Sequence, residues 1–369
     1  MFTVPTIALD SNRFFKSHNQ VACAVIFCLF SFVYLFFYQA DVLAAAQHVL
    51  SEGKTHYGRT VGAVLITLTL FLLQRVVYEI TKLEKRAHAL TYFPSLLVLT
   101  IITDVSSNID QGFSFGWWYL AFPLLLILFY GLALGLKQVE PFEPESASMG
   151  YMSRTTWVNV LTLVAMFIGV GLFSNADETF HYRMRMERLV AEGKYTKALK
   201  VGKASGATDH YLTSLRAFIL SRKGLIGEHF FEFPVARKGD TVAPDSADLR
   251  NILLPDSVMI DYSKTARAKL DYKLIDLLID KDLEGFGKLV AKAYPDSIFP
   301  KHYAEALILN QWKKGKLADD DDSELANSLR DFLKPNGKRK VVNTKMYAWK
   351  HYRHTYWYYY IYGGNKEDS

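Results

Sequence analysis

The run Gly112–Gly116 reads G-x-S-x-G, the spacing that presents the nucleophilic serine of α/β hydrolases. That chemistry needs a buried strand before the serine and a helix after it, within a sheet. Here the motif stands in a short loop just before Trp117 and Trp118, where a long apolar run begins. We interpret its glycines as a turn at a membrane edge and predict no catalytic residue in it.

Three groupings of acidic and histidine residues suggest metal ligation, and each is incomplete. Glu178 and His181 form one E-x-x-H step, whereas a di-iron bundle uses two such steps and two further glutamates. Asp319–Asp322 is a run of four acids without the alternating oxygens and glycine of a calcium loop. His351 and His354 lack an acidic or cysteine partner. The sequence therefore predicts no metal and no cofactor.

Charged residues inside apolar runs are functional candidates, because burying a charge in a membrane is costly. Three such intramembrane polar candidates are Arg75, Glu79 and Asp104. Each lies near the end of its apolar run, where solvation at the membrane surface accounts for it. They leave open an alternative function as a polytopic membrane enzyme or transport component acting on a lipid-linked or glycan substrate.

The elements that carry these residues fall into two halves with different charge. Residues 1–174 hold 10 Lys/Arg and 10 Asp/Glu, and residues 175–369 hold the remaining 33 Lys/Arg and 27 Asp/Glu. The whole net charge of +6 therefore belongs to the second half. We predict two domains with these boundaries.

The first half contains apolar runs long enough to cross a hydrocarbon core, which takes about 20 residues. The sequence predicts an all-α membrane helix bundle of about five spans, or three if two shorter runs are core helices. The runs are Val21–Ala40, Val61–Leu73, Leu90–Ile102, Trp117–Leu136 and Trp157–Phe173. On the fourth run, Gly131 and Gly135 form a G-x-x-x-G pair, which predicts close packing against another helix.

Loop charge predicts the orientation, since cytoplasmic loops are enriched in Lys and Arg. With the N-terminus inside, the outer loops carry only Lys54 and Arg59, and five crossings place residues 175–369 outside the cytoplasm. That second half has neither Cys nor an Asn-x-Ser/Thr sequon. We expect a multi-pass protein of the bacterial inner membrane with a periplasmic C-terminal domain. The inner segments carry Arg13, Lys16, Arg75, Lys82, Lys85, Arg86, Lys137 and Arg154.

The second half has apolar residues at helical spacing, and one stretch resembles a tetratricopeptide repeat. Gly193 and Tyr195 stand where that repeat turns between its two helices, and Ala198 stands where a small residue lets the second helix pack. Gly202 departs from the pattern, which prefers a large aromatic residue there. We predict a degenerate, TPR-like α-solenoid whose further helices lie within residues 209–222 and 264–314.

Two sets of residues in this half are candidates for binding a partner. Lysines recur at every third position in one set, and aromatic residues crowd the C-terminal tail in the other. The tail is interpreted either as a terminal cap on the helical array or as a binding platform for a partner or a membrane. The candidates are Lys194, Lys197, Lys200, Tyr347, Trp349, Tyr356, Trp357 and Tyr359.

A membrane bundle followed by such a helical tail resembles a family of bacterial envelope proteins of uncharacterised function. The resemblance rests on Gly193–Tyr195, Pro300–Leu307 and Tyr356–Tyr360, and it implies no activity and no site residue. The first hypothesis is a membrane-anchored scaffold that presents a helical domain to a protein partner in the cell envelope. Its other partners are the lipid bilayer and anionic lipid or glycan, and nucleic acid is not expected.

Overall fold

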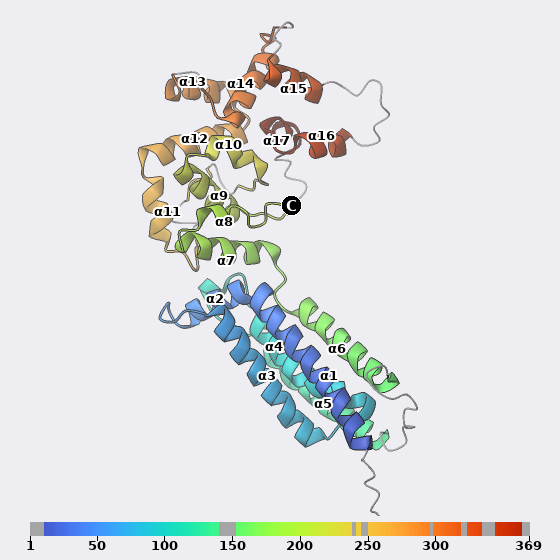
Figure 1. Ribbon diagram of the computed structural model, residues 1–369. Coiled ribbons are helices and arrows are strands. Elements are labelled where there is room, and N and C mark those ends of the chain that lie inside the picture. The colour runs from blue at the N-terminus through green and yellow to red at the C-terminus, as the bar shows by residue number, and fades with distance from the viewer. Residues whose placement is uncertain are drawn as a thin grey trace, which may run out of the picture. The chain divides into compact units, whose positions relative to one another are not determined.

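A computed structural model describes residues 11–139, 153–237, 241–244, 250–295, 298–318, 323–333 and 344–363. Within these ranges every regular element is a helix, which confirms the all-α fold class. The chain divides into two compact units, Met1–His181 and Tyr182–Ser369, called here the N-terminal and C-terminal units (Figure 1). The acidic run Asp319–Asp322 lies outside the described residues.

The N-terminal unit is a bundle in which the long helices run side by side (Figure 1). A π-helical turn, η1, continues the first helix directly, and two 3₁₀ helices, η2 and η3, lie on either side of α4. The elements are α1 (Ser11–Val33), η1 (Tyr34–Tyr38), α2 (Ala40–Leu50), α3 (Arg59–Thr81), η2 (Lys85–Tyr92), α4 (Phe93–Thr103), η3 (Ile109–Gln111), α5 (Trp118–Val139) and α6 (Arg154–Phe173).

Four helical stretches of the described residues are long and apolar enough to cross a membrane: Asn19–Tyr38, Arg59–Thr81, Trp118–Val139 and Arg154–Phe173. The predicted run Leu90–Ile102 is not a fifth helix of that kind. Its α-helical part, α4, has 11 residues and is about 16 Å long at 1.5 Å per residue. The sequence prediction of about five spans is therefore corrected to four helices of membrane-crossing length among the described residues.

Residues 85–103 nevertheless run the length of the bundle, because η2 leads directly into α4. At one end the carbonyl of Lys85 accepts from the Asn159 amide at 2.7 Å, near the start of α6. At the other end the carbonyl of Thr103 accepts from the backbone N–H of Asn175, just beyond α6, at 3.1 Å. Eight 3₁₀ residues and eleven α residues together measure about 32 Å. That length matches a hydrocarbon core of about 30 Å.

The C-terminal unit is built from shorter helices joined by tight turns (Figure 1). Side-chain oxygens of Asp209, Thr265 and Asp282 cap α9, α12 and α13 at their N-termini, so backbone donors there are satisfied. The helices are α7 (Glu178–Ala191), α8 (Tyr195–Ala198), α9 (His210–Lys223), α10 (Ile226–His229), η5 (Phe230–Glu232), α11 (Asp256–Ser263), α12 (Ala266–Ile279), α13 (Leu283–Ala293), α14 (Lys301–Lys313), α15 (Glu324–Leu333), α16 (Thr344–Tyr352) and α17 (Tyr356–Tyr362).

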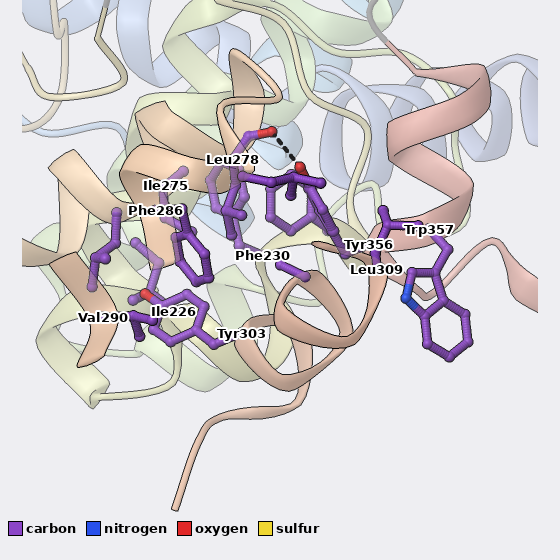
Figure 2. Close-up of a cluster of buried hydrophobic side chains, with 14 of the residues drawn as sticks. Ile226, Phe230, Ile275, Leu278, Phe286, Val290, Tyr303, Leu309, Tyr356 and Trp357 are labelled. Carbon is purple, nitrogen blue, oxygen red and sulfur yellow. Dashed lines mark hydrogen bonds between the residues drawn. The ribbon is translucent and has the colours of Figure 1, made fainter. Parts of the chain in front are cut away.

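The main core of the C-terminal unit gathers apolar side chains from helices that are far apart in the sequence. Figure 2 shows it between α10, α12, α13, α14 and α17. Phe286 and Tyr303 pack edge to face, with ring centroids 5.3 Å apart. Tyr356 and Trp357 of α17 belong to this same cluster, so the last described helix completes the core.

The stretch that resembles a tetratricopeptide repeat forms its turn but not its second helix. Gly193 ends α7 with φ +71°, a backbone conformation that favours glycine. Ala198 is fully buried, as the resemblance implies, but α8 ends at that residue. At Gly202 φ is +62°, and a Cβ there would lie 2.7 Å from the Tyr182 ring. The predicted second helix of the repeat therefore stops at Ala198, and residues 199–204 form turns in which Gly202 takes the left-handed conformation.

Candidate functional site

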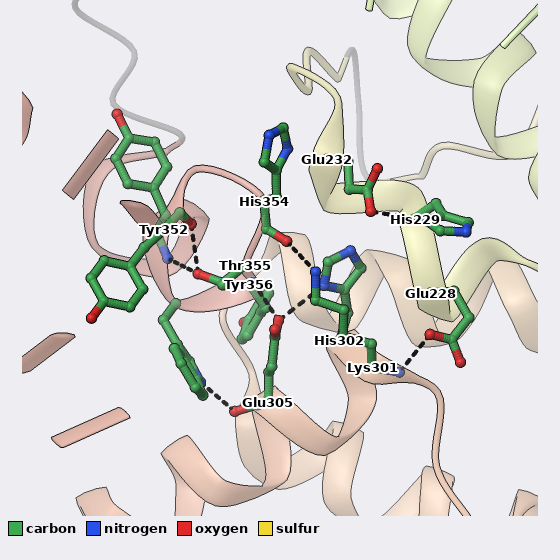
Figure 3. Close-up of polar contacts among 12 residues, drawn as sticks. Glu228, His229, Glu232, Lys301, His302, Glu305, Tyr352, His354, Thr355 and Tyr356 are labelled. Atoms are coloured by element: carbon green, nitrogen blue, oxygen red, sulfur yellow. Dashed lines mark hydrogen bonds and ion pairs between the residues drawn. The ribbon is translucent and has the colours of Figure 1, made fainter. Parts of the chain in front are cut away.

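The C-terminal helix α17 is fastened to α14 through Glu305. Its buried carboxylate accepts from the backbone N–H of Tyr356 at 2.7 Å, and its backbone carbonyl accepts from the Trp357 indole N–H at 2.8 Å (Figure 3). The Tyr356 hydroxyl donates to the carbonyl of Leu278 at 2.9 Å (Figure 2). Burial raises the pKa of the Tyr356 hydroxyl, so the group stays protonated and can donate this hydrogen bond. Tyr356 and Trp357 are therefore parts of the core.

His302 lies in the same buried cluster and is inaccessible to a substrate. Its Nδ1 is 3.0 Å from the Glu305 carboxylate (Figure 3). Its ring packs edge to face on Phe231, and its side chain is fully buried. Nε2 has no hydrogen-bond partner. A histidine–carboxylate pair can act as a general base only when its free nitrogen reaches a reacting proton. The arrangement therefore serves to join helices.

Glu232 forms a second junction, at the surface beside the tail. Lys203 contacts its carboxylate at 2.8 Å. His229 contacts it at 2.9 Å (Figure 3). Burial alone would raise the pKa of Glu232, but the hydrogen bonds from Lys203 and His229 outweigh it and lower the pKa to about 2. The nearby Lys301 ammonium donates to the backbone carbonyl of His354 at 2.9 Å. The Glu232 contacts hold η5 against α10 and the turn after α8, and the Lys301 contact holds α14 against the loop before α17.

The two histidines of the tail face different environments. His351 packs against Tyr347, with ring centroids 4.5 Å apart, whereas the Arg353 side chain donates to Nε2 of His354 at 3.0 Å. Burial and the Arg353 charge lower the pKa of His354. No three His, Cys, Asp or Glu residues of the described ranges are grouped so that they could hold a metal ion.

The helix α16 exposes the remaining tail aromatics. Tyr347 is 38% exposed and Trp349 is 47% exposed, while Ala348 between them is buried. The Arg353 guanidinium lies over the Trp349 ring, 4.6 Å from its centroid. Tyr359 of α17 is half-buried against Phe231, and burial raises its pKa to about 12. The aromatic candidates thus divide into core residues on α17 and surface residues on α16.

An open cavity of about 550 Å³ lies between α9 and α11. Its lining combines charge of both signs with apolar surface: Arg222, Ser257, Val258, Asp261 and Tyr262. The Arg222 guanidinium stands over the rings of Tyr195 and Phe218, 5.4 and 5.9 Å from their centroids. Asp261 pairs with Lys264 at 3.0 Å. The Tyr262 hydroxyl is fixed by Ser221 at 3.0 Å. The lining therefore contains one aromatic side chain, Tyr262, which Ser221 fixes, and one cation, Arg222.

The lysine candidates are placed on the surface near this cavity wall. Lys194 pairs with Glu192 at 2.6 Å, and Lys197 and Lys200 are exposed. Tyr195, on the same turn, is half-buried and lies under Arg222. Lys194, Lys197 and Lys200 thus lie on the outer face of the four-residue helix α8 and the turns beside it.

The structure does not bring the intramembrane charged candidates together. Glu79 pairs with Lys82 on an exposed helix end, and Arg75 lies over the Tyr78 ring. Asp104 accepts from the Trp118 indole N–H at 2.7 Å. Gly131 and Gly135 face open space, since a Cβ added to either would meet nothing within 4 Å. No described helix of this chain makes the close approach predicted for that pair.

Uncharged polar side chains form a buried hydrogen-bond network around η2, which was not predicted from the sequence. Asn159 accepts from the backbone N–H of Ala89 at 2.7 Å and donates to Lys85, while Asn19 donates to the same Lys85 carbonyl at 3.3 Å. Gln74 of α3 donates to Thr91 at 2.9 Å. The two asparagines satisfy backbone groups of η2 inside the bundle, and Gln74 satisfies the Thr91 hydroxyl. The signal in the sequence was three amides within or beside apolar runs.

One family model matches residues 234–363, and its description is a family of unknown function (DUF6057). The matched region begins after η5 and includes α11 to α17, so it contains both tail helices and the Glu305 junction. No curated protein and no solved structure matches the chain.

Proposed function

We propose that this chain is a membrane-anchored interaction protein whose C-terminal unit binds a protein partner in the cavity between α9 and α11. The cavity is the observation that carries the proposal. Arg222 at its rim would pair with a carboxylate of the partner, and Val258 and Tyr262 would cover an apolar side chain. Contact pockets rich in Tyr and Arg contribute much of the binding energy of protein interfaces.

The proposed setting follows from the apolar helices and the loop charges. Four helices long and apolar enough to cross a membrane would hold the N-terminal unit in a bilayer. We propose the inner membrane of a bacterium, with the N-terminus in the cytoplasm and the C-terminal unit in the periplasm. This topology requires residues 85–103 to cross the membrane as a fifth segment beside the four helices. The TPR-like character of that unit is likewise proposed, on the turn at Gly193 and the packing of Ala198.

Site-specific photo-crosslinking in cells tests the partner proposal. A benzophenone amino acid at Ser257, an exposed cavity residue, should yield a discrete adduct, and the same group at Lys288 on α13 should not. Arg222→Glu should abolish the Ser257 adduct, while Lys314→Glu, a matched charge reversal on the surface of another segment, should leave it unchanged. Equal adducts at both positions, or an adduct that survives Arg222→Glu, would contradict the proposal.

The alternative of a membrane enzyme or transport component makes a different prediction. It places the chemistry in the N-terminal unit, so activity would be lost on Asp104→Asn or Glu79→Gln without any effect on the Ser257 adduct. The structure gives these two carboxylates separate partners, Trp118 and Lys82. For that reason the interaction role is the one we propose.

A further inference from the structure

We infer that α16 is a membrane-binding element, whose exposed aromatic and basic face docks on an anionic phospholipid surface. This surface is separate from the cavity lined by Arg222 and does not depend on a protein partner. The inference rests on what α16 exposes, how its residues are arranged around the helix, and which charges accompany them.

The helix α16 leaves its large apolar side chains in solvent. Met346 is 60% exposed, in addition to the exposed Tyr347 and Trp349, whereas Ala348 is buried and Tyr352 is half-buried. An ordinary surface helix buries its large apolar residues and exposes its polar ones. On α16 the small side chain of Ala348 is buried, while the larger Met346, Tyr347 and Trp349 are exposed. The apolar face of the helix therefore points away from the core.

The exposed residues form one continuous face. Successive residues of a helix are rotated by about 100°, which places Met346 and Lys350 together at the middle of that face. Tyr347 lies on one flank and Trp349 on the other, opposite the side that Ala348 and Tyr352 turn toward the protein. A basic residue therefore stands at the centre of an aromatic and apolar surface.

The charges of this stretch have one sign. Residues 344–363 contain Lys345, Lys350 and Arg353 and neither Asp nor Glu. Trp and Tyr prefer the boundary between headgroups and acyl chains, and Lys and Arg can reach anionic headgroups while their stems lie along apolar surface. A protein groove that receives a helix selects an uninterrupted apolar stripe, which Lys350 breaks. The combination fits an anionic bilayer surface better than a protein groove.

The rest of the unit holds this face outward. α16 packs on α17, and α17 is fixed to the core by Trp357 and Tyr356. The Lys281 ammonium donates to the carbonyl of Gly363, at the end of α17, at 3.1 Å. The helix α16 thus packs on α17, which is fixed to the core, and it does not need to refold in order to bind a membrane.

A fluorescence experiment on the full chain tests the inference. A polarity-sensitive probe is attached at Met346→Cys, in a background with Cys23 and Cys28 changed to alanine, and the chain is placed in phosphatidylcholine nanodiscs. Including phosphatidylglycerol in the nanodisc, or adding vesicles that contain it, should shift the emission to the blue. Phosphatidylcholine vesicles should not. A probe at Gln311→Cys, exposed on α14, should remain unchanged.

Matched double variants separate docking from general surface effects. Trp349→Ser with Lys350→Glu should weaken vesicle binding at least about tenfold, since each basic residue near an anionic surface adds substantially to binding. Trp312→Ser with Lys314→Glu makes the same chemical changes at a Trp that is 46% exposed, and should leave binding intact. Circular dichroism melting verifies that both variants fold.

Three outcomes would overturn the inference: a blue shift with phosphatidylcholine alone, equal losses in the two double variants, or unchanged binding after Trp349→Ser with Lys350→Glu. Loss of the Ser257 crosslink in the Trp349 variant without any change in vesicle binding would assign α16 to a protein partner and also overturn it. Failure of the crosslinking experiment alone would contradict the proposed function and leave this inference standing.

Discussion

At Glu232 a single carboxylate joins three segments of the C-terminal unit. Lys203 comes from the turn after α8 and His229 from the end of α10, so the carboxylate fixes both against η5. The side chain is 14% exposed, which makes the pairing stronger than that of a fully solvated ion pair. Because the pairing lowers the pKa of Glu232 in the folded protein, the stability of the C-terminal unit should depend on pH.

Replacing Glu232 with Gln should destabilise the C-terminal unit by about 1–2 kcal/mol at pH 7, after allowance for the half-exposed Lys203. The folded pKa, about 2, lies below the ordinary value of 4.5. The stabilisation is therefore present above pH 4.5 and is lost as pH falls toward 2. Urea unfolding of the chain in nanodiscs at several pH values measures the difference from wild type.

The control for this residue is Glu284→Gln, because Glu284 pairs with Lys288 in an exposed position. Its unfolding free energy should stay within about 0.5 kcal/mol of wild type at every pH. If the difference in unfolding free energy between Glu232→Gln and wild type does not shrink between pH 4.5 and pH 2, the stabilising role given to the ionised Glu232 is wrong.

At the scale of the element, the tail contains one tryptophan in the core and one on the surface. Trp357→Ala should lower the unfolding free energy of the C-terminal unit by about 3–5 kcal/mol, because it leaves a cavity and removes the indole hydrogen bond to the Glu305 carbonyl. Trp349→Ala should change it by less than about 0.5 kcal/mol. Chemical unfolding followed by circular dichroism compares the two, and equal losses would show that α17 is not a core element.

The composite segment of η2 and α4 depends on Asn159. Asn159→Leu leaves the N–H of Ala89 and the carbonyl of Lys85 without this partner, which should cost about 2–4 kcal/mol inside the bundle. The reaction rate of the buried Cys23 thiol with a maleimide reports opening of the bundle and should rise. Thr162→Val is the control, since the Thr162 hydroxyl bonds only to Val158 of its own helix. Similar rates in both variants would argue against the role of Asn159.

The sequence predicted the elements whose signal is local. A charge-free run such as Val21–Ala40 is recognised from composition alone, because the length of a membrane-crossing helix is set by the bilayer. The start of the composite segment was predicted too late, at Leu90, because Lys85, Arg86 and His88 dilute its apolar pattern, while the side chain that bonds to its Ala89 N–H lies 70 residues away. Likewise, nothing local distinguishes the buried Trp357 from the exposed Trp349. They are separated by contacts that are distant in the sequence, among them the Glu305 carbonyl that accepts from Trp357.

At the scale of the whole molecule, the side of the membrane that the C-terminal unit faces depends on residues 85–103. If the segment crosses, Lys82 and Gln111 lie on opposite sides; both are exposed. A membrane-impermeant maleimide should then label Gln111→Cys in intact cells or spheroplasts, and Lys82→Cys only after permeabilisation. Labelling of both from the same side would leave four crossings and place the C-terminal unit on the side of the N-terminus.

The Asn159 contacts also set an order of assembly. The backbone of η2 is synthesised well before α6, yet the amide that satisfies Ala89 arrives 70 residues later. Until then, a segment that carries Lys85, Arg86 and His88 has little reason to leave water, because charged side chains are costly to bury and the Ala89 N–H lacks the side-chain acceptor that Asn159 later provides. The bundle therefore closes late, when α6 emerges from the ribosome. A chain truncated before α6 should hold its first helices in the membrane and leave residues 85–103 outside it.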